Sequence, residues 1–248
     1  MTKTRFGFFV KCPSMEMIEA MGIAGCDFAV VDMEHTPLGP RDLYPLLLAA
    51  ERRNLELIVR IPTKTDYYMK WCRDLNVHTI QVPHVESAKD VEFAIQHTMF
   101  NPVGNRGLCR FVRASDFSGK NKDEYLDSAN GSNKLILQIE GLNAVKNIEE
   151  IISATPKFIS LFVGPYDLSQ SMGMPGDIWN PNVKDKMKYI IDLCKKSGIE
   201  IGTFTDTEEG LAYWKNQGID FIQYSSDLNC FIKAARSLMS ITTYPLGY

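Results

Sequence analysis

Two acidic side chains stand where the chain could hold a divalent cation. Glu140 ends the apolar run LILQIE, and Asp167 follows the next apolar run, in the segment VGPYD. If both runs are neighbouring parallel strands, the two carboxylates meet at one edge of the sheet, with positions left for water or substrate. Such an open, oxygen-rich site suits Mg²⁺ or Mn²⁺ better than Zn²⁺. The structural alternative is that Glu140 caps the following helix and Asp167 caps a turn.

Arg60 and His35 could supply positive charge and proton transfer near the same edge. Arg60 ends the run LIVR, where it could hold a substrate carboxylate or an enolate oxygen. The alternative is that Arg60 forms a structural ion pair with Asp32 or Glu34. His35 follows these two acids in the segment DMEH, and a neutral imidazole there can accept a proton near neutral pH. His84, after another apolar run, is a lesser candidate.

Eight short apolar runs, rich in β-branched and aromatic residues, predict the strands that must position these groups. The runs are residues 6–11, 28–34, 57–61, 79–85, 135–140, 158–164, 200–205 and 221–226. Amphipathic segments predict helices near residues 14–24, 40–53, 65–76, 87–98, 143–153, 182–197, 207–217 and 228–240. This alternation predicts right-handed βαβ units and a parallel sheet. Eight such units in 248 residues predict the α/β class, as a (β/α)₈ TIM barrel with a single domain spanning residues 1–248.

A doubly wound open sheet is the alternative fold. The turn after the first predicted strand reads KCPSM and lacks the glycines of a dinucleotide-binding turn, which favours the barrel. If the polar, glycine-bearing stretch 99–134 is an extended βα segment, it lies over the C-terminal face of the barrel. Active sites of such barrels form at the C-terminal strand ends, so the candidate residues share one mouth.

The amino-acid composition argues against nucleic acids and membranes as binding partners. Lys and Arg number 27 against 30 Asp and Glu, for a net charge of −3, which leaves no basic footprint for nucleic acid or an anionic membrane. No apolar segment approaches the roughly 20 residues of a membrane span. The six cysteines are scattered without a CxxC pair, which predicts reduced thiols. We therefore expect a cytoplasmic protein that acts on a small molecule.

Several motifs between residues 32 and 169 occur in the order and spacing of one enzyme family, and the resemblance extends over nearly the whole chain. They are DMEH at 32–35, Val59-Arg60, PVGNRG at 102–107, QIE at 138–140 and FVGPYDLS at 162–169. In this set the chain resembles the HpcH/HpaI aldolase family of metal-dependent class II pyruvate aldolases. That family includes the 2-keto-3-deoxy sugar acid and 4-hydroxy-2-oxo acid aldolases.

The resemblance implies roles for individual residues. Glu140 and Asp167 match the metal ligands, for Mg²⁺ or Mn²⁺ and with Co²⁺ also possible, and Arg60 matches the arginine on the ketone or enolate oxygen. His35 matches the acid–base histidine, and Asp74 matches an aspartate that the family pairs with it. Asp74 falls late in the third predicted helix, away from the mouth. It is therefore expected to act in a neighbouring subunit's site or only to orient structure.

The resemblance also implies a cradle for the pyruvyl carboxylate. Its residues are Gln138, Gly164, Pro165 and Tyr166, with the backbone N–H groups around Tyr166 and Asp167. The chain departs from the family at Tyr166, where alanine is common. A larger, polar side chain at that position is expected to reshape the substrate pocket.

The leading functional hypothesis is reversible aldol cleavage of a 4-hydroxy-2-oxo acid, such as a 2-keto-3-deoxy sugar acid, to pyruvate and an aldehyde. The metal would polarise the 2-oxo group, Arg60 would stabilise the enolate, and His35 would take the 4-hydroxyl proton. One alternative is an oxaloacetate or acyl-CoA lyase with the same metal scheme. Another is a Schiff-base aldolase using Lys11. The last is a catalytically inactive barrel that serves as a binding module.

The family resemblance further implies a homo-oligomer, with a hexamer possible. The final segment TTYPLGY, residues 242–248, carries two aromatic residues that could pack on a neighbouring subunit or simply trail from the barrel.

Overall fold

The computed structural model describes residues 3–243, so the two aromatic residues of the final segment lie outside it. Eight parallel strands form a closed barrel in the order β1 to β8. Their bounds are β1 Arg5–Val10, β2 Phe28–Asp32, β3 Glu56–Arg60, β4 Thr79–Val82, β5 Lys134–Ile139, β6 Ile159–Val163, β7 Ile201–Thr205 and β8 Phe221–Ser226. The predicted (β/α)₈ barrel is confirmed.

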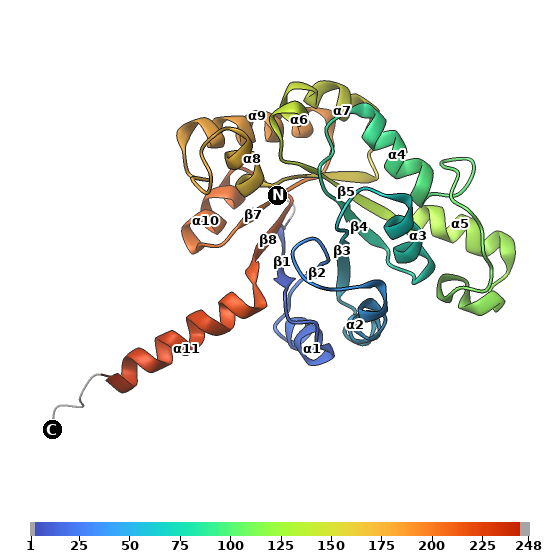
Figure 1. The fold of residues 1–248 in the computed structure, drawn as a ribbon, viewed down its shortest axis with the longest axis horizontal. Helices are drawn as coiled ribbons and strands as arrows, with labels where there is room; N and C mark the ends of the chain where they lie inside the picture. The colour runs from blue at the N-terminus through green and yellow to red at the C-terminus, as the bar shows by residue number, and fades with distance from the viewer. Residues whose placement is uncertain (1–2, 244–248) are drawn as a thin grey trace.

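Helices surround the barrel in the described part of the chain (Figure 1). They are α1 Met15–Ile23, α2 Pro40–Arg53, α3 Asp66–Asp74, α4 Ala88–Thr98, α5 Lys122–Ser132, α6 Leu142–Lys146, α7 Ile148–Ala154, α8 Pro165–Ser171, α9 Pro181–Ser197, α10 Glu208–Asn216 and α11 Asp227–Thr243, with the 3₁₀ segment η1 Arg113–Ser118. α11 contacts β1 and β8 at its start and then projects away from the barrel. No helix among residues 3–243 has the length and apolarity to cross a bilayer.

Three segments differ from the sequence-based expectation. The helix predicted over 143–153 is two short helices that meet at Asn147, where the backbone leaves the helical region (φ −97°, ψ 11°). The segment after β6 forms α8, because Pro165 at its first position sets a helical φ. The stretch 99–134 does not cover the C-terminal face. It follows α4 rather than a strand, and Lys134 pairs beside Thr79 at the opposite, N-terminal strand ends.

Side chains alternate along each strand, so every second residue points into the barrel. The interior cluster contains Phe9, Phe28, Val30, Ile58, Ile136, Phe162 and Phe221. A glycine makes room for one of its rings, because a Cβ at Gly202 would lie 2.2 Å from the Phe221 ring. A second, larger apolar cluster fills the space between strands and helices. The alternation also determines which strand-end residues face the mouth.

Candidate active site

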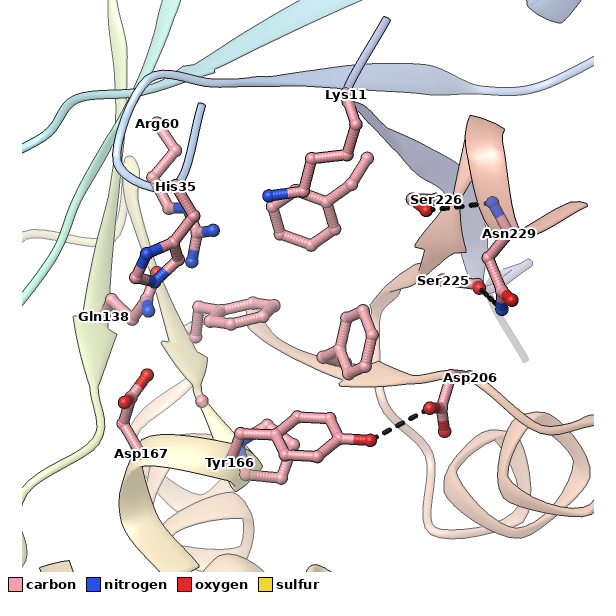
Figure 2. Close-up of a pocket in the computed structure, with 15 residues that line it drawn as sticks. Lys11, His35, Arg60, Gln138, Tyr166, Asp167, Asp206, Ser225, Ser226 and Asn229 are labelled. Carbon is pink, nitrogen blue, oxygen red and sulfur yellow. Dashed lines mark hydrogen bonds between the residues drawn. The ribbon is translucent and has the colours of Figure 1, made fainter. Parts of the chain in front are cut away.

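A cavity of about 430 Å³ opens at the C-terminal end of the barrel (Figure 2). Most of the residues predicted for the site line it. They are His35, Arg60, Gln138, Gly164, Pro165, Tyr166 and Asp167. Glu140 lies at the same end of the barrel but is only 3% exposed. Asp74 does not line this cavity.

The period of two along the strands explains this convergence. Arg60 follows the interior residue Ile58 by two positions, and Gln138 follows Ile136 in the same way. Asp32 lies directly beside Arg60 in the β2–β3 register. The polar residues therefore form the layer immediately above the apolar barrel interior, where the cavity begins.

Glu140 is held by specific hydrogen bonds. Its Oε1 accepts the backbone N–H of His84 at 2.8 Å and lies 3.0 Å from His84 Nδ1, and its Oε2 accepts from Gln138. Burial alone would raise the pKa of Glu140, but the hydrogen bonds from His84 and Gln138 outweigh it and lower that pKa. Glu140 therefore stays ionised, and its side chain does not cap the helix that follows.

Asp167 carries the second carboxylate, in the first turn of α8. Burial and the negative charge of Glu140 raise the pKa of Asp167. Two like charges thus meet in a partly desolvated site, and a cation shared by both would favour their ionised forms. Within residues 3–243 no cluster of three or more His, Cys, Asp or Glu side chains has the arrangement of a metal site. The assignment of Glu140 and Asp167 as metal ligands stays a prediction from the sequence.

His84, a lesser candidate from the sequence, lies in direct contact with Glu140 of the acidic pair. Its hydrogen bond with Glu140 raises the pKa of His84 to about 9, against the effect of burial. Its Nε2 also lies 3.2 Å from Glu34 Oε1. The backbone at His84 adopts a left-handed φ of 54°, an unusual conformation that concentrates at functional sites. The sequence indicated a role for His84 only through its position just after β4, the strand that neighbours β5.

Arg60 both forms the ion pairs of the structural alternative and lines the cavity. Its Nε and Nη2 lie 2.9 and 2.8 Å from the two carboxylate oxygens of Asp32, and its Nη1 lies 3.1 Å from Glu34 Oε2. The guanidinium stacks over Phe9 with 4.8 Å to the ring centroid. These contacts fix the orientation of the guanidinium. The Arg60 residue as a whole is 8% exposed.

Lys11 joins this cluster from β1. Its ammonium pairs with Asp32, so that one buried carboxylate serves two cations. Burial alone would raise the pKa of Asp32, but Arg60 and Lys11 outweigh it and lower that pKa from 3.8 to about 2. The two cations and the carboxylates of Asp32 and Glu34 form a group with no net charge. Sequence reasoning named Asp32 only as a possible structural partner.

A chain of buried amides supports the site from below. Gln223 donates to Gln81, Gln81 Nε2 donates to Gln138 Oε1 at 2.6 Å, and Gln138 donates to Glu140. Each amide orients the next, because a buried polar group must find a partner. The amides come from β8, β4 and β5, and no local pattern in the sequence indicates that they meet.

His35 and Asp74 are not brought together within this chain. The His35 side chain is 61% exposed at the rim of the cavity, with Nε2 at 3.8 Å from Glu34 Oε2. Asp74 ends α3 and forms an ion pair with Arg106 at 2.7 Å. It borders a separate surface depression with the exposed rings of Tyr67 and Trp71.

Comparison with known proteins identifies the family of this chain. Residues 5–234 match the family model described as HpcH/HpaI aldolase/citrate lyase. The chain belongs to this family, and the resemblance read from the sequence is confirmed.

Relatives and solved structures cover nearly the full length. The chain is 35% identical over 233 residues to 2-dehydro-3,6-dideoxy-6-sulfogluconate aldolase of Pseudomonas putida, covering 94% of this chain and 90% of that protein. It is 31% identical over 244 residues to hydroxypyruvate/pyruvate aldolase of Paraburkholderia phytofirmans, covering 96% and 93%. The crystal structure of a HpcH/HpaI aldolase/citrate lyase family protein from Burkholderia cenocepacia superposes with a TM-score of 0.92 at 29% identity, covering 98% and 95%.

Proposed function

We propose that this protein catalyses reversible, divalent-metal-dependent aldol cleavage of a 4-hydroxy-2-oxo acid to pyruvate and an aldehyde. The relatives are named as aldolases, which confirms the prediction of an aldolase. The observation that carries the specific proposal is the convergence of Glu140, Asp167, Arg60 and Gln138 at one end of the barrel. An acidic pair and a fixed guanidinium at the same end of the barrel suit a substrate with adjacent carboxylate and ketone oxygens.

Glu140 and Asp167 are the proposed metal ligands, with Mg²⁺ or Mn²⁺ as the preferred ions and Co²⁺ as a further possibility. Two carboxylates leave positions for substrate oxygens and water, as hard divalent cations require. When bound, the ion supplies Lewis acidity to the ketone of the substrate. The fit is supported by the chemistry of two carboxylates at one end of the barrel, and it agrees with the pKa of Asp167, which burial and then the charge of Glu140 raise.

The remaining groups hold the pyruvyl part of the substrate. Gln138 donates one amide N–H to Glu140, which leaves its second N–H for a carboxylate oxygen. The backbone N–H groups of Tyr166 and Asp167 lie in the first turn of α8, where they have no acceptor within the helix. Gly164 keeps the approach open, because a Cβ there would lie 2.9 Å from Glu140 Oε2.

Cleavage breaks the C3–C4 bond of the substrate. The 4-hydroxyl loses its proton and becomes the aldehyde carbonyl, while the electron pair passes to the enolate of pyruvate. Arg60 stabilises the developing negative charge on the enolate oxygen, and its fixed ion pairs avoid reorganisation during the step. His35 accepts the hydroxyl proton, directly or through water, and returns it in the reverse direction.

The alternatives fit less well. A Schiff-base mechanism needs Lys11 as a free amine, yet its ammonium is paired with the buried carboxylate of Asp32. An oxaloacetate or acyl-CoA lyase would use the same acidic pair, and the aldolase names of the relatives favour the aldolase over it.

We further propose a homo-oligomer, with a hexamer as one possible form. Helix α11 projects from the barrel and exposes Phe231, Leu238 and Ile241 to 65–70%. The depression beside Asp74 exposes the rings of Tyr67 and Trp71. Apolar surfaces of this kind favour contact with another subunit. Asp74 would then serve the site of a neighbouring subunit or orient structure there.

We propose that the protein is located in the cytoplasm, because its cysteines form no disulfide bonds. All six are free thiols in the structure, two of them buried in the core. Unpaired thiols are typical of a reducing compartment.

Exchange of the methyl protons of pyruvate in D₂O, followed by ¹H NMR, tests the function without knowledge of the aldehyde. We expect exchange with added Mg²⁺ or Mn²⁺, loss of exchange after chelation, and recovery when the ion is restored. Absence of exchange with every divalent ion tried would favour an inactive binding module. Exchange that survives chelation, with borohydride trapping pyruvate on Lys11, would favour the Schiff-base mechanism.

A further inference from the structure

The cavity has a second polar wall, opposite the residues assigned to pyruvate. This distal wall consists of Asp206, Ser225, Ser226 and Asn229, and it lies across the cavity from His35, Arg60, Gln138 and Asp167 (Figure 2). We propose that the distal wall binds the hydroxyl groups of the aldehyde, and that the aldehyde is a short, neutral polyhydroxy aldehyde without an anionic end. The inference rests on the proposed function, because it names the second product of that reaction.

Asp206 presents a carboxylate oriented by Tyr166. The Tyr166 hydroxyl donates to Asp206 Oδ2 at 2.9 Å, and the Tyr166 ring packs edge-on against Phe204 with 5.7 Å between centroids. Within the described residues, Asp206 Oδ1 has no hydrogen-bond partner. Lys233 donates to the backbone oxygen of Asp206 at 2.8 Å and forms no ion pair with its carboxylate. The distal wall therefore offers one fixed, negatively charged acceptor.

Ser225, Ser226 and Asn229 present both kinds of hydrogen-bonding group. Asn229 Nδ2 donates to Ser225 Oγ at 2.7 Å, and the Asn229 backbone N–H donates to Ser226 Oγ at 3.2 Å. Each serine oxygen accepts one bond and retains its own proton as a donor, while the Asn229 carbonyl oxygen remains an acceptor. A sugar hydroxyl donates and accepts at once, so it can satisfy such a mixed set.

The backbone supports a built site. Ser225 adopts a left-handed φ of 42°, a conformation that residues other than glycine rarely take. Such strain persists where the surrounding structure enforces it, and it concentrates at functional sites. The strained residue lies where β8 passes into α11, next to Asn229 in the first turn of that helix.

Charge decides between neutral and anionic aldehydes. The cations nearest the middle of the cavity, Lys11 and Arg60, are already matched by Asp32 and Glu34. In the described part of the chain Asp206 has no such ion pair, and Lys233 bonds its backbone oxygen without lining the cavity, so the side chains that form the distal wall carry one negative charge. A carboxylate, sulfonate or phosphate at the far end of the aldehyde would lie near the Asp206 carboxylate. Repulsion between these like charges would weaken binding of such an aldehyde.

Aromatic rings also line the cavity. Phe9, Phe162 and Phe204 lie there, with Phe9 and Phe204 5.8 Å apart between centroids. This apolar belt offers contacts to the carbon atoms of the substrate, in which C3 of the pyruvyl part is bonded directly to the hydroxyl-bearing C4. The belt leaves the two polar walls as separate recognition points.

The test compares aldehydes in the addition direction, with pyruvate as the common partner. Neutral glyceraldehyde is set against glyceraldehyde 3-phosphate and against the three-carbon semialdehyde that carries a carboxylate. For the wild type we expect kcat/KM to favour glyceraldehyde by at least about tenfold over either anion. In Asp206→Asn this ratio should fall by about tenfold or more, because the charge is lost while the amide oxygen still accepts from Tyr166. Asp192→Asn, the same change on the exposed face of α9, is the matched control and should keep the wild-type ratio.

A second variant tests the hydroxyl contacts. Asn229→Ala should lower kcat/KM for glyceraldehyde relative to propanal, which has the same carbon chain and no hydroxyl groups. Both readouts are ratios within one protein, so changes in the pyruvate half cancel.

The outcomes separate the inference from the function on which it rests. If the wild type exchanges the pyruvate protons but uses anionic aldehydes as well as neutral ones, the inference is wrong and the aldolase remains. The same holds if Asp206→Asn leaves the ratio unchanged. If the wild type neither exchanges pyruvate protons nor adds any aldehyde, the proposed function fails and the inference fails with it.

Discussion

Replacing Asp32 with asparagine removes a negative charge that Arg60 and Lys11 share at the wall of the cavity. Because these cations hold the pKa of Asp32 at about 2 instead of 3.8, the ionised carboxylate stabilises the folded state. At about 1.4 kcal/mol per pH unit, the difference corresponds to roughly 2 kcal/mol. The variant also leaves two cations near each other without their partner, so we expect a loss of about 2–4 kcal/mol in the free energy of unfolding at pH 7.

The pH dependence of this loss has a defined sign. A folded-state pKa below the unfolded value stabilises the protein above the unfolded value, here 3.8, and the contribution disappears as the pH falls through the folded value of about 2. The difference between wild type and Asp32→Asn should therefore be full at pH 7 and reduced by roughly half at pH 3.

Urea unfolding followed by circular dichroism at pH 7 and at pH 3 measures both quantities. Asp127→Asn, on the exposed face of α5, is the control for the chemical change alone and should cost less than about 0.5 kcal/mol. The reasoning is refuted if Asp32→Asn unfolds at the same urea concentration as this control at pH 7. It is equally refuted if the difference from wild type does not narrow at acid pH.

The other predictions concern the exchange of pyruvate protons. Glu140→Gln should reduce the exchange rate by about 10²–10³ with an unchanged far-ultraviolet spectrum, and a folded variant with wild-type exchange would contradict its assignment. Arg60→Lys should lower the rate by at least about 10², because an ammonium cannot reproduce the paired contacts of the guanidinium; a change under twofold would count against its role. Gly164→Ala should lower exchange by about tenfold or more, since its Cβ would lie 2.9 Å from a Glu140 oxygen. Gly131→Ala, where a Cβ meets nothing within 4 Å, should match the wild type. Chelation should abolish exchange and Mg²⁺ or Mn²⁺ should restore it, whereas full activity in chelator would contradict the metal requirement.

The barrel could be predicted because its strands are buried on both faces. A strand such as β2, with every residue buried, reads as a continuous apolar run, and eight such runs separated by amphipathic segments allow few other folds. The helix α8 was missed because it is short and polar, with seven residues and no amphipathic repeat, although Pro165 at its first position favours a helix start. The stretch 99–134 would cover the C-terminal face only as a βα segment, and this condition is not met because α4 precedes the stretch.

The site residues that end strands could be predicted from the sequence. The contacts between residues of different strands could not. Arg60 and Glu140 follow buried runs, so position alone indicated the mouth of the barrel. The pairing of Lys11 with Asp32 and the contact of His84 with Glu140 depend on the closure of the barrel. A sequence shows the residue types but not these distances, since each contact joins different strands.

The distal wall could not be predicted from the sequence either, because its contacts also join different strands. Tyr166 follows β6, while Asp206 follows β7, and their hydrogen bond forms only when the two strand ends lie side by side. The sequence showed Tyr166 as a departure from the family and indicated a reshaped pocket. The structure adds the partner of its hydroxyl group.

The central claim is that Glu140 and Asp167 share one divalent cation beside Arg60. A crystal grown with Mn²⁺ and pyruvate, measured for anomalous scattering, tests it most directly. We predict a single strong anomalous peak in the cavity, in contact with a carboxylate oxygen of each acid, with pyruvate between the ion and the guanidinium. Pyruvate bound with no ion at the two carboxylates, in crystals of enzyme that exchanges the methyl protons, would contradict the account.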